Sequence, residues 1–150
     1  MGYNTRSGYN AYREIGVRTA SQGSLVVMLY DGAVSHLEEA IALVEGENRL
    51  APGHIEAFGK HLQKVTDIIS ELEASLDLER GGEIAENLMA LYIFFTKQLT
   101  AGTISHDKKQ LQDVLGMLTE LQESWVTAAN STANTQVEMP ADRPTISVTG

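Results

Sequence analysis

The sequence predicts an all-α protein that folds as an antiparallel up-down four-helix bundle. Three observations support this fold class. Four segments between residues 21 and 129 carry apolar residues at alternating spacings of three and four, which place them on one face of a helix. The connections between these segments are short, so we expect successive helices to lie antiparallel. Apolar residues show no period-two alternation in this region, so we expect no β-sheet.

The first predicted helix covers residues 22–45. Ser21 suits the N-cap position, because its hydroxyl can accept a hydrogen bond from a free backbone N–H. Gly46 suits the end of the helix, because glycine takes the left-handed conformation at low cost. The apolar face of this helix consists of Leu25, Leu29, Ala33, Leu37, Ile41 and Val44, flanked by Val26, Tyr30 and Ala40.

The second predicted helix covers residues 55–76 and has the most regular pattern. Pro52 and Gly53 mark its start, since proline is well tolerated in a first helical turn. Residues 77–82 end it and include two glycines. Its apolar residues follow a heptad pattern and are Ile55, Phe58, Leu62, Val65, Ile69, Leu72 and Leu76.

The third and fourth predicted helices cover residues 83–101 and 106–129. Gly102 is the expected end of the third helix, and Ser105 is the expected N-cap of the fourth. The apolar face of the third helix consists of Ile84, Leu88, Leu91, Phe95 and Leu99, with Ala85 and Tyr92 beside it. That of the fourth consists of Leu111, Val114, Leu118, Leu121, Trp125 and Ala128.

We divide the chain into an N-terminal arm of residues 1–20, a bundle of residues 21–129 and a C-terminal tail of residues 130–150. Several glycines interrupt any helical pattern in the arm, which we expect to be irregular and mobile. The tail is rich in Ser, Thr and Asn and has few large apolar residues. We expect the tail to be disordered, because it cannot bury enough apolar area to offset its ordering entropy.

Charge and composition exclude several classes of function. The formal net charge is −9 and the basic residues are scattered, so a nucleic-acid partner or an anionic membrane surface is not expected. No apolar run approaches the roughly 18 residues of a membrane span, and residues 1–18 lack the apolar core of a secretory signal. The chain has no cysteine. These features predict a cytoplasmic protein without membrane insertion.

The sequence offers no pattern typical of an enzyme or a metal centre. A di-iron bundle uses Glu-x-x-His on two helices, but no acidic residue stands three positions before any of the four histidines. His54 and His61 lie two helical turns apart, too far for one ion. We interpret each histidine as a solvated surface residue and expect no enzyme activity, no metal, no cofactor and no small-molecule substrate. An enzyme with a metal in the bundle remains as an alternative class.

The remaining class of function is binding. Apolar clefts between the helices of a bundle are suited to receive an amphipathic helix. Three tyrosines in the arm, Tyr3, Tyr9 and Tyr12, provide aromatic side chains that could dock on such a cleft, although an incidental role in a frayed terminus is equally compatible with the composition. Periodicity alone does not separate an apolar face that is buried from one that binds a partner.

Three separated motifs resemble the flagellin export chaperone family, FliS. The run from Thr19 to Ala33 reads TASQGSLVVMLYDGA, close to the family pattern T-A-S-P-x-x-L-I-x-M-L-Y-D-G-A. Residues 76–88 read LDLERGGEIAENL and are followed by Leu91 and Tyr92. The third motif is the tryptophan near the end of the last helix. The resemblance spans residues 9 to about 129. Gln22 departs from it by replacing the family proline, which implies a looser first helical turn.

This resemblance implies a function and two partners. Chaperones of this family bind the C-terminal helical segment of newly made flagellin, prevent its premature polymerisation and deliver it to the cytoplasmic domain of the flagellar type III export gate. The family's N-terminal arm is thought to lie over part of the binding groove when no flagellin is bound. The alternative is a helical-bundle adaptor for another flagellar axial or regulatory protein.

The resemblance also assigns candidate protein-binding residues. Tyr12 matches a family tyrosine implicated in docking to the export gate, and Tyr9 matches a neighbouring apolar position. Asp31 can hydrogen-bond across the bundle or to the arm, or it can face solvent. Trp125 is either part of the core, which we favour, or the wall of a groove. The complete set of candidates is Tyr9, Tyr12, Ile15, Val17, Leu25, Tyr30, Asp31, Leu91, Tyr92 and Trp125.

Overall fold

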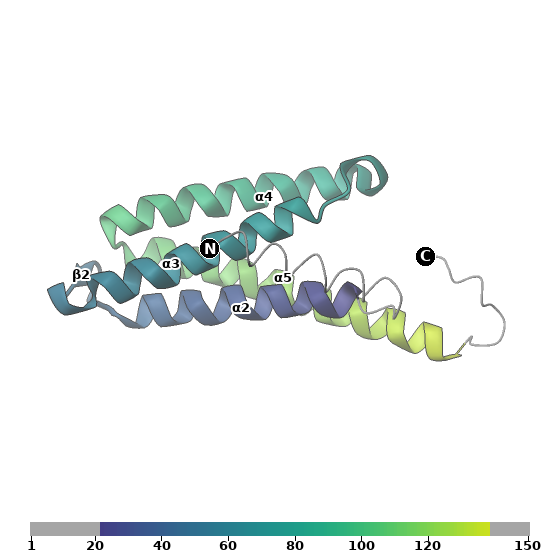
Figure 1. Ribbon diagram of the computed structural model, residues 1–150, viewed down its shortest axis with the longest axis horizontal. Helices are drawn as coiled ribbons and strands as arrows, with labels where there is room; N and C mark the ends of the chain where they lie inside the picture. Colours follow the sequence, from purple (N-terminus) through teal and green to yellow (C-terminus); the bar gives the residue numbers. More distant parts are fainter. Residues whose placement is uncertain (1–21, 139–150) are drawn as a thin grey trace.

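A computed structural model describes residues 22–138, and the side chains of residues 23–130. The described residues form four long helices, α2 (Gln22–Ala42), α3 (Ile55–Ala74), α4 (Leu78–Ser105) and α5 (Lys108–Glu138). Consecutive helices pack against each other, and α2 also packs against α5, so the four close into an up-down bundle (Figure 1). The predicted fold class is confirmed. No helix among the described residues is long and apolar enough to cross a membrane.

The core follows the apolar faces predicted for α2 and α3. Tyr30 and Leu37 from α2, and Val44 two residues beyond the end of α2, belong to one core cluster with residues from α3. The α3 residues are Phe58, Leu62, Val65, Ile69 and Leu72, and all of these side chains are fully buried or nearly so. Ile55 departs from the prediction, because it is the first residue of α3 and lies beyond the end of the packed interface, exposed to solvent.

The buried face of α4 is rotated relative to the predicted one. The residues that enter the core are Ala85, Tyr92, Phe95 and Leu99. Ile84 is 73% exposed, and Leu88 and Leu91 are only partly buried. Both sets recur at helical spacing, so the sequence pattern fits either face, and packing against α3 and α5 selects the one that carries the two aromatic rings.

The expectation of no β-sheet is wrong for four residues. Helix α2 ends at Ala42, and β1 (Val44–Glu45) pairs antiparallel with β2 (Arg49–Leu50). Gly46 has φ of 63° in the turn between these strands, so its left-handed conformation serves a hairpin rather than the end of a helix. The short 3-10 helix η1 (Pro52–His54) then leads into α3. The strands are too short for periodicity to reveal them.

The turn between α4 and α5 also differs from the prediction. Helix α4 continues past Gly102 to Ser105, and His106 closes it in the left-handed conformation with φ of 59°. Ser105 is therefore not the N-cap of α5; its hydroxyl accepts from the Asp107 N–H, and Asp107 Oδ1 accepts from the N–H of Gln110. Gly102 is instead a packing residue, since a Cβ there would lie 2.7 Å from Leu111 Cδ2.

Helix α5 is longer than predicted. It continues through Asn130 to Glu138, past the predicted end at residue 129. The expected disorder of the tail stays a prediction. Extending an existing helix is easier than starting one, because each added residue gains one backbone hydrogen bond. This segment also contains no proline, which would interrupt the helix. Residues 1–21 and 139–150, and with them Ser21, the arm and the rest of the tail, lie outside the described residues.

Candidate functional site

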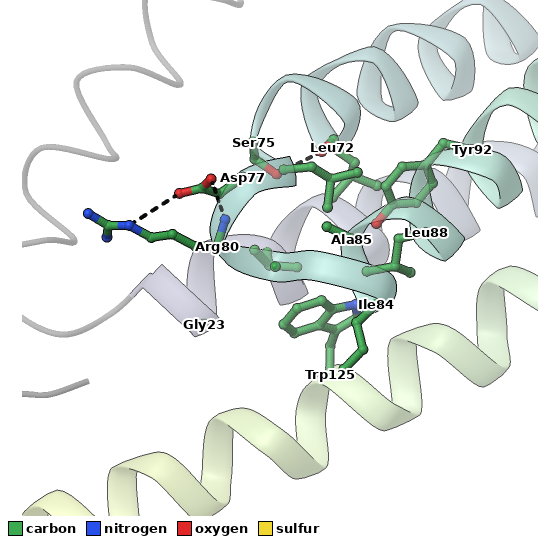
Figure 2. Close-up of a pocket in the computed structure, with 13 residues that line it drawn as sticks. Gly23, Leu72, Ser75, Asp77, Arg80, Ile84, Ala85, Leu88, Tyr92 and Trp125 are labelled. Carbon is green, nitrogen blue, oxygen red and sulfur yellow. Dashed lines mark hydrogen bonds and ion pairs between the residues drawn. The ribbon is translucent and has the colours of Figure 1, made fainter.

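The side chains of the bundle become less buried toward one end, where α2 and α4 begin and α3 and α5 end. Along α5, Leu118 is fully buried, Leu121 and Trp125 are partly buried and Ala128 is exposed. A pocket of about 440 Å³ opens at this end (Figure 2). Its lining is mainly apolar and consists of Gly23, Val26, Leu72, Ser75, Leu76, Asp77, Arg80, Gly81, Ile84, Ala85, Leu88, Tyr92 and Trp125.

The turn between α3 and α4 shapes one wall of this pocket. Asp77 Oδ1 accepts hydrogen bonds from the N–H groups of Glu79 and Arg80, which caps the first turn of α4. Gly82 then interrupts the helix with φ of 57° and ψ of −135°, a conformation that residues with a Cβ rarely adopt. This interruption offsets the first turn of α4 from the rest, and Ile84 and Leu88 border the opening (Figure 2).

An aromatic group from three helices lies at the pocket: Tyr92 and Trp125 belong to its lining, and Tyr30 contacts both of them. The Tyr30 and Tyr92 hydroxyls are hydrogen-bonded to each other at 2.6 Å, and both rings are buried. The Trp125 ring stacks on Tyr30 with centroids 6.5 Å apart. Burial raises the pKa of the Tyr30 phenol, which the hydrogen bonds with Tyr92 and Trp125 partly offset. Burial, followed by the interaction with Tyr30, raises the pKa of Tyr92 more strongly.

This arrangement suits apolar contact rather than proton transfer. The two tyrosines keep their protons at neutral pH and hydrogen-bond with each other, so their polar atoms are satisfied inside the bundle. The lining side chains are aliphatic or aromatic, apart from three. The Ser75 hydroxyl donates to the Leu72 carbonyl, and Asp77 and Arg80 at the rim form an ion pair at 3.7 Å. The site can therefore bury an apolar surface of a partner.

The structure gathers only part of the predicted set of binding residues. Tyr92 and Trp125 line the pocket, and Tyr30 lies behind them. Leu25 is a core residue and Leu91 is partly buried outside the lining. Trp125, for which we favoured a core position, is partly buried. It packs against the hydrophobic core, and its ring also lines the pocket (Figure 2). The remaining candidates, Tyr9, Tyr12, Ile15 and Val17, lie outside the described residues.

Asp31 combines two of the roles considered for it. Its side chain is exposed, and its Oδ1 accepts a hydrogen bond from Gln122 Nε2 on α5. Asp31 thus ties α2 to α5 across the bundle surface, one residue beyond the buried Tyr30. It does not line the pocket.

Sequence reasoning missed several residues that line the pocket. Leu72, Leu76, Ile84 and Leu88 were assigned to apolar faces without a binding role, although residues 76–88 belong to a family-like motif. The motif was the signal that could have pointed to this region. Apolar periodicity explains its aliphatic positions, but it does not explain the glycine pair at 81–82. The structure shows that this pair shapes the pocket wall.

Comparison with known proteins gives a consistent result. The profile of the family described as "Flagellar protein FliS" matches residues 5–132. The flagellar secretion chaperone FliS of Salmonella typhimurium is 37% identical over 126 residues, which cover 81% of this chain and 89% of that protein. Its counterpart in Vibrio cholerae is 33% identical, with 80% and 87% covered. The counterpart in Bacillus subtilis is 29% identical, with 82% and 86% covered.

These matches extend over the whole bundle, including the α2 segment around Tyr30, the turn at Gly82 and the Trp125 wall. The residues that build the apolar pocket thus fall within the region shared with these chaperones. The chain belongs to the FliS family of flagellar secretion chaperones.

Proposed function

We propose that this protein binds the C-terminal helical segment of flagellin in the cytoplasm, prevents its premature polymerisation and delivers it to the flagellar type III export gate. The observation that carries this proposal is the open apolar pocket between the ends of the four helices. Its relatives are named flagellar secretion chaperones, which is consistent with a flagellar cargo.

The pocket has the size and chemistry to hold apolar side chains of a helix. Its volume of about 440 Å³ lies within the roughly 300–1,000 Å³ of typical ligand sites. An amphipathic helix places side chains at i, i+3 and i+4 on one face, and such a face fits an apolar groove. Each Å² of apolar surface removed from water contributes roughly 25 cal/mol before ordering costs. Binding of this kind needs no nucleotide.

The test is a calorimetric titration of the full chain with the isolated C-terminal segment of a flagellin from the same organism. We expect saturable one-to-one binding with a gain of helix and a negative heat-capacity change. Replacing Ile84 with aspartate should weaken binding by about 10- to 100-fold, because a charge at the pocket wall must be desolvated by the cargo.

Ile104→Asp is the matched control. Ile84 and Ile104 lie on the same helix and are 73% and 80% exposed, but Ile104 is not part of the pocket lining. Equal losses in the two variants would argue against the pocket as the binding site. No binding by the wild-type chain at tens of micromolar would reject flagellin as the cargo, and binding of another flagellar axial protein would then assign the protein as an adaptor.

The role of the arm is a separate prediction. We propose that Tyr12 docks the chaperone to the cytoplasmic domain of the export gate, as the family resemblance implies. Tyr12→Ala should reduce binding of that domain, measured by surface plasmon resonance, by about 10-fold or more while thermal unfolding of the bundle stays unchanged. A lower melting temperature with unchanged gate binding would make Tyr12 a structural residue instead.

A further inference from the structure

Two histidines and a glutamate from neighbouring helices meet at the interface of α2 and α3. His36 Nδ1 and His61 Nδ1 are 3.1 Å apart, and their ring centroids are separated by 5.3 Å. Glu39, one turn after His36 on α2, places a carboxylate oxygen 3.1 Å from His61 Nε2. Both histidines are partly buried, so the interpretation of all four histidines as solvated surface residues is wrong for this pair.

The spacing of the donor atoms matches that of a small metal centre. Donors about 2.0–2.1 Å from a tetrahedral zinc ion lie about 3.3–3.4 Å from one another. The two Nδ1 atoms are already near this separation, and one donor atom from each of the three residues lies within 4.8 Å of the others. Coordination would therefore require a contraction of at most about 1.5 Å.

Each imidazole can offer a metal one ring-nitrogen lone pair, so the two histidines supply one ligand each. Glu39 and Lys64 are the charged side chains that act on His36. The carboxylate of Glu39 would offset part of the charge of a divalent ion, and Lys64 would oppose it.

We propose that His36, Glu39 and His61 bind a divalent transition metal of the zinc class, linking α2 to α3. Two imidazoles and one carboxylate are donors that zinc accepts, whereas magnesium prefers a shell of oxygen atoms. Three protein ligands leave a fourth position for water. In Figure 1 these two helices run side by side, so one ion would join segments 25 residues apart in the sequence.

The site is independent of the proposed cargo pocket. His36 lies about 20 Å along the α2 axis from Gly23, at roughly 1.5 Å per residue, and Gly23 is at the pocket. The metal should therefore stabilise the bundle without changing the affinity for a flagellin segment. A failure of either proposal leaves the other unaffected.

The experiment titrates Zn²⁺ into the full chain, prepared without an affinity tag, and follows thermal unfolding in parallel. We expect one zinc ion per chain and a melting temperature that rises by about 5 °C at saturating zinc, because a ligand bound only to the folded state stabilises it. Mg²⁺ at the same concentration should leave the melting temperature unchanged.

Loss of an outer-shell partner typically weakens metal binding by roughly 10- to 100-fold. His36→Ala and His61→Ala each remove a direct ligand, so each should weaken zinc binding by more than this. His54→Ala is the matched control, since His54 is exposed and lies outside the cluster. Glu39→Gln removes the charge with little change in shape and should weaken binding in a chain that folds normally. The proposal is rejected if wild-type protein shows no zinc-dependent shift, or if His54→Ala loses as much affinity as His36→Ala.

Discussion

Replacing Phe95 with alanine is expected to lower the free energy of unfolding by about 3–5 kcal/mol. The Phe95 ring on α4 is completely buried within the main hydrophobic cluster of the bundle. Truncation removes its transfer free energy from the folded state and leaves a cavity that the surrounding helices fill only in part. Urea unfolding of the full chain, followed by circular dichroism, measures this loss.

The preceding residue provides the matched control. Phe94 is 39% exposed and its ring centroid lies 6.1 Å from that of Phe95. Phe94→Ala deletes the same group from the same helix and should cost about 1 kcal/mol or less, as is usual for surface positions. Similar losses in both variants would show that the assignment of the buried face of α4 is wrong.

Raising the pH above 10 is expected to destabilise the bundle through Tyr30 and Tyr92. Burial raises the pKa of both phenols above their ordinary value of 10.0. Between the ordinary and the raised pKa, the unfolded chain loses these protons while the folded chain keeps them. The stability that the pair contributes is thus fully present below pH 10. It then falls as the pH rises, by up to about 1.4 kcal/mol per pH unit for each tyrosine.

The double variant Tyr30→Phe/Tyr92→Phe should remove this dependence. At pH 7 it should be close to wild type in stability, because both partners of the hydrogen bond are replaced by apolar groups of similar shape. The single variant Tyr30→Phe should cost about 1–3 kcal/mol at pH 7, since it leaves the buried Tyr92 hydroxyl without this partner. Urea unfolding at pH 7, 10 and 11 tests both expectations. An identical alkaline loss in wild type and double variant would assign the effect to other groups.

The apolar pattern predicted the helices well and their ends less well. Spacings of three and four identified all four helices of the described region, because a helix must bury one face along its length. Gly46 and Gly102 satisfied the same local criterion for a helix end, yet neither ends a helix. Gly46 lies in the turn between β1 and β2, and Gly102 lies inside α4 against Leu111. Whether a glycine ends a helix or allows close packing depends on what lies opposite, which local sequence does not contain.

The pocket was predicted only in part, for a related reason. Ile84 and Leu88 have the periodicity of core residues, but at this end of the bundle the helices leave them partly or largely uncovered. Trp125 was expected in the core; it packs against the core and also lines the pocket. An apolar face has the same sequence pattern whether a neighbouring helix covers it or a partner does, so the distinction required the packing of all four helices.

The amino-acid pattern alone was enough to predict the fold class, the order of the helices and, through three motifs, the family. These features depend on residues that are close together in the sequence. The helical backbone places residues three or four positions apart on the same face, so their spacing shows which way their side chains point. The side-chain contacts between helices, such as Asp31 with Gln122 and His36 with His61, could be seen only in the folded structure. Those contacts depend on the rotation of each helix about its axis and on the register between helices, which the summed packing of the whole core sets.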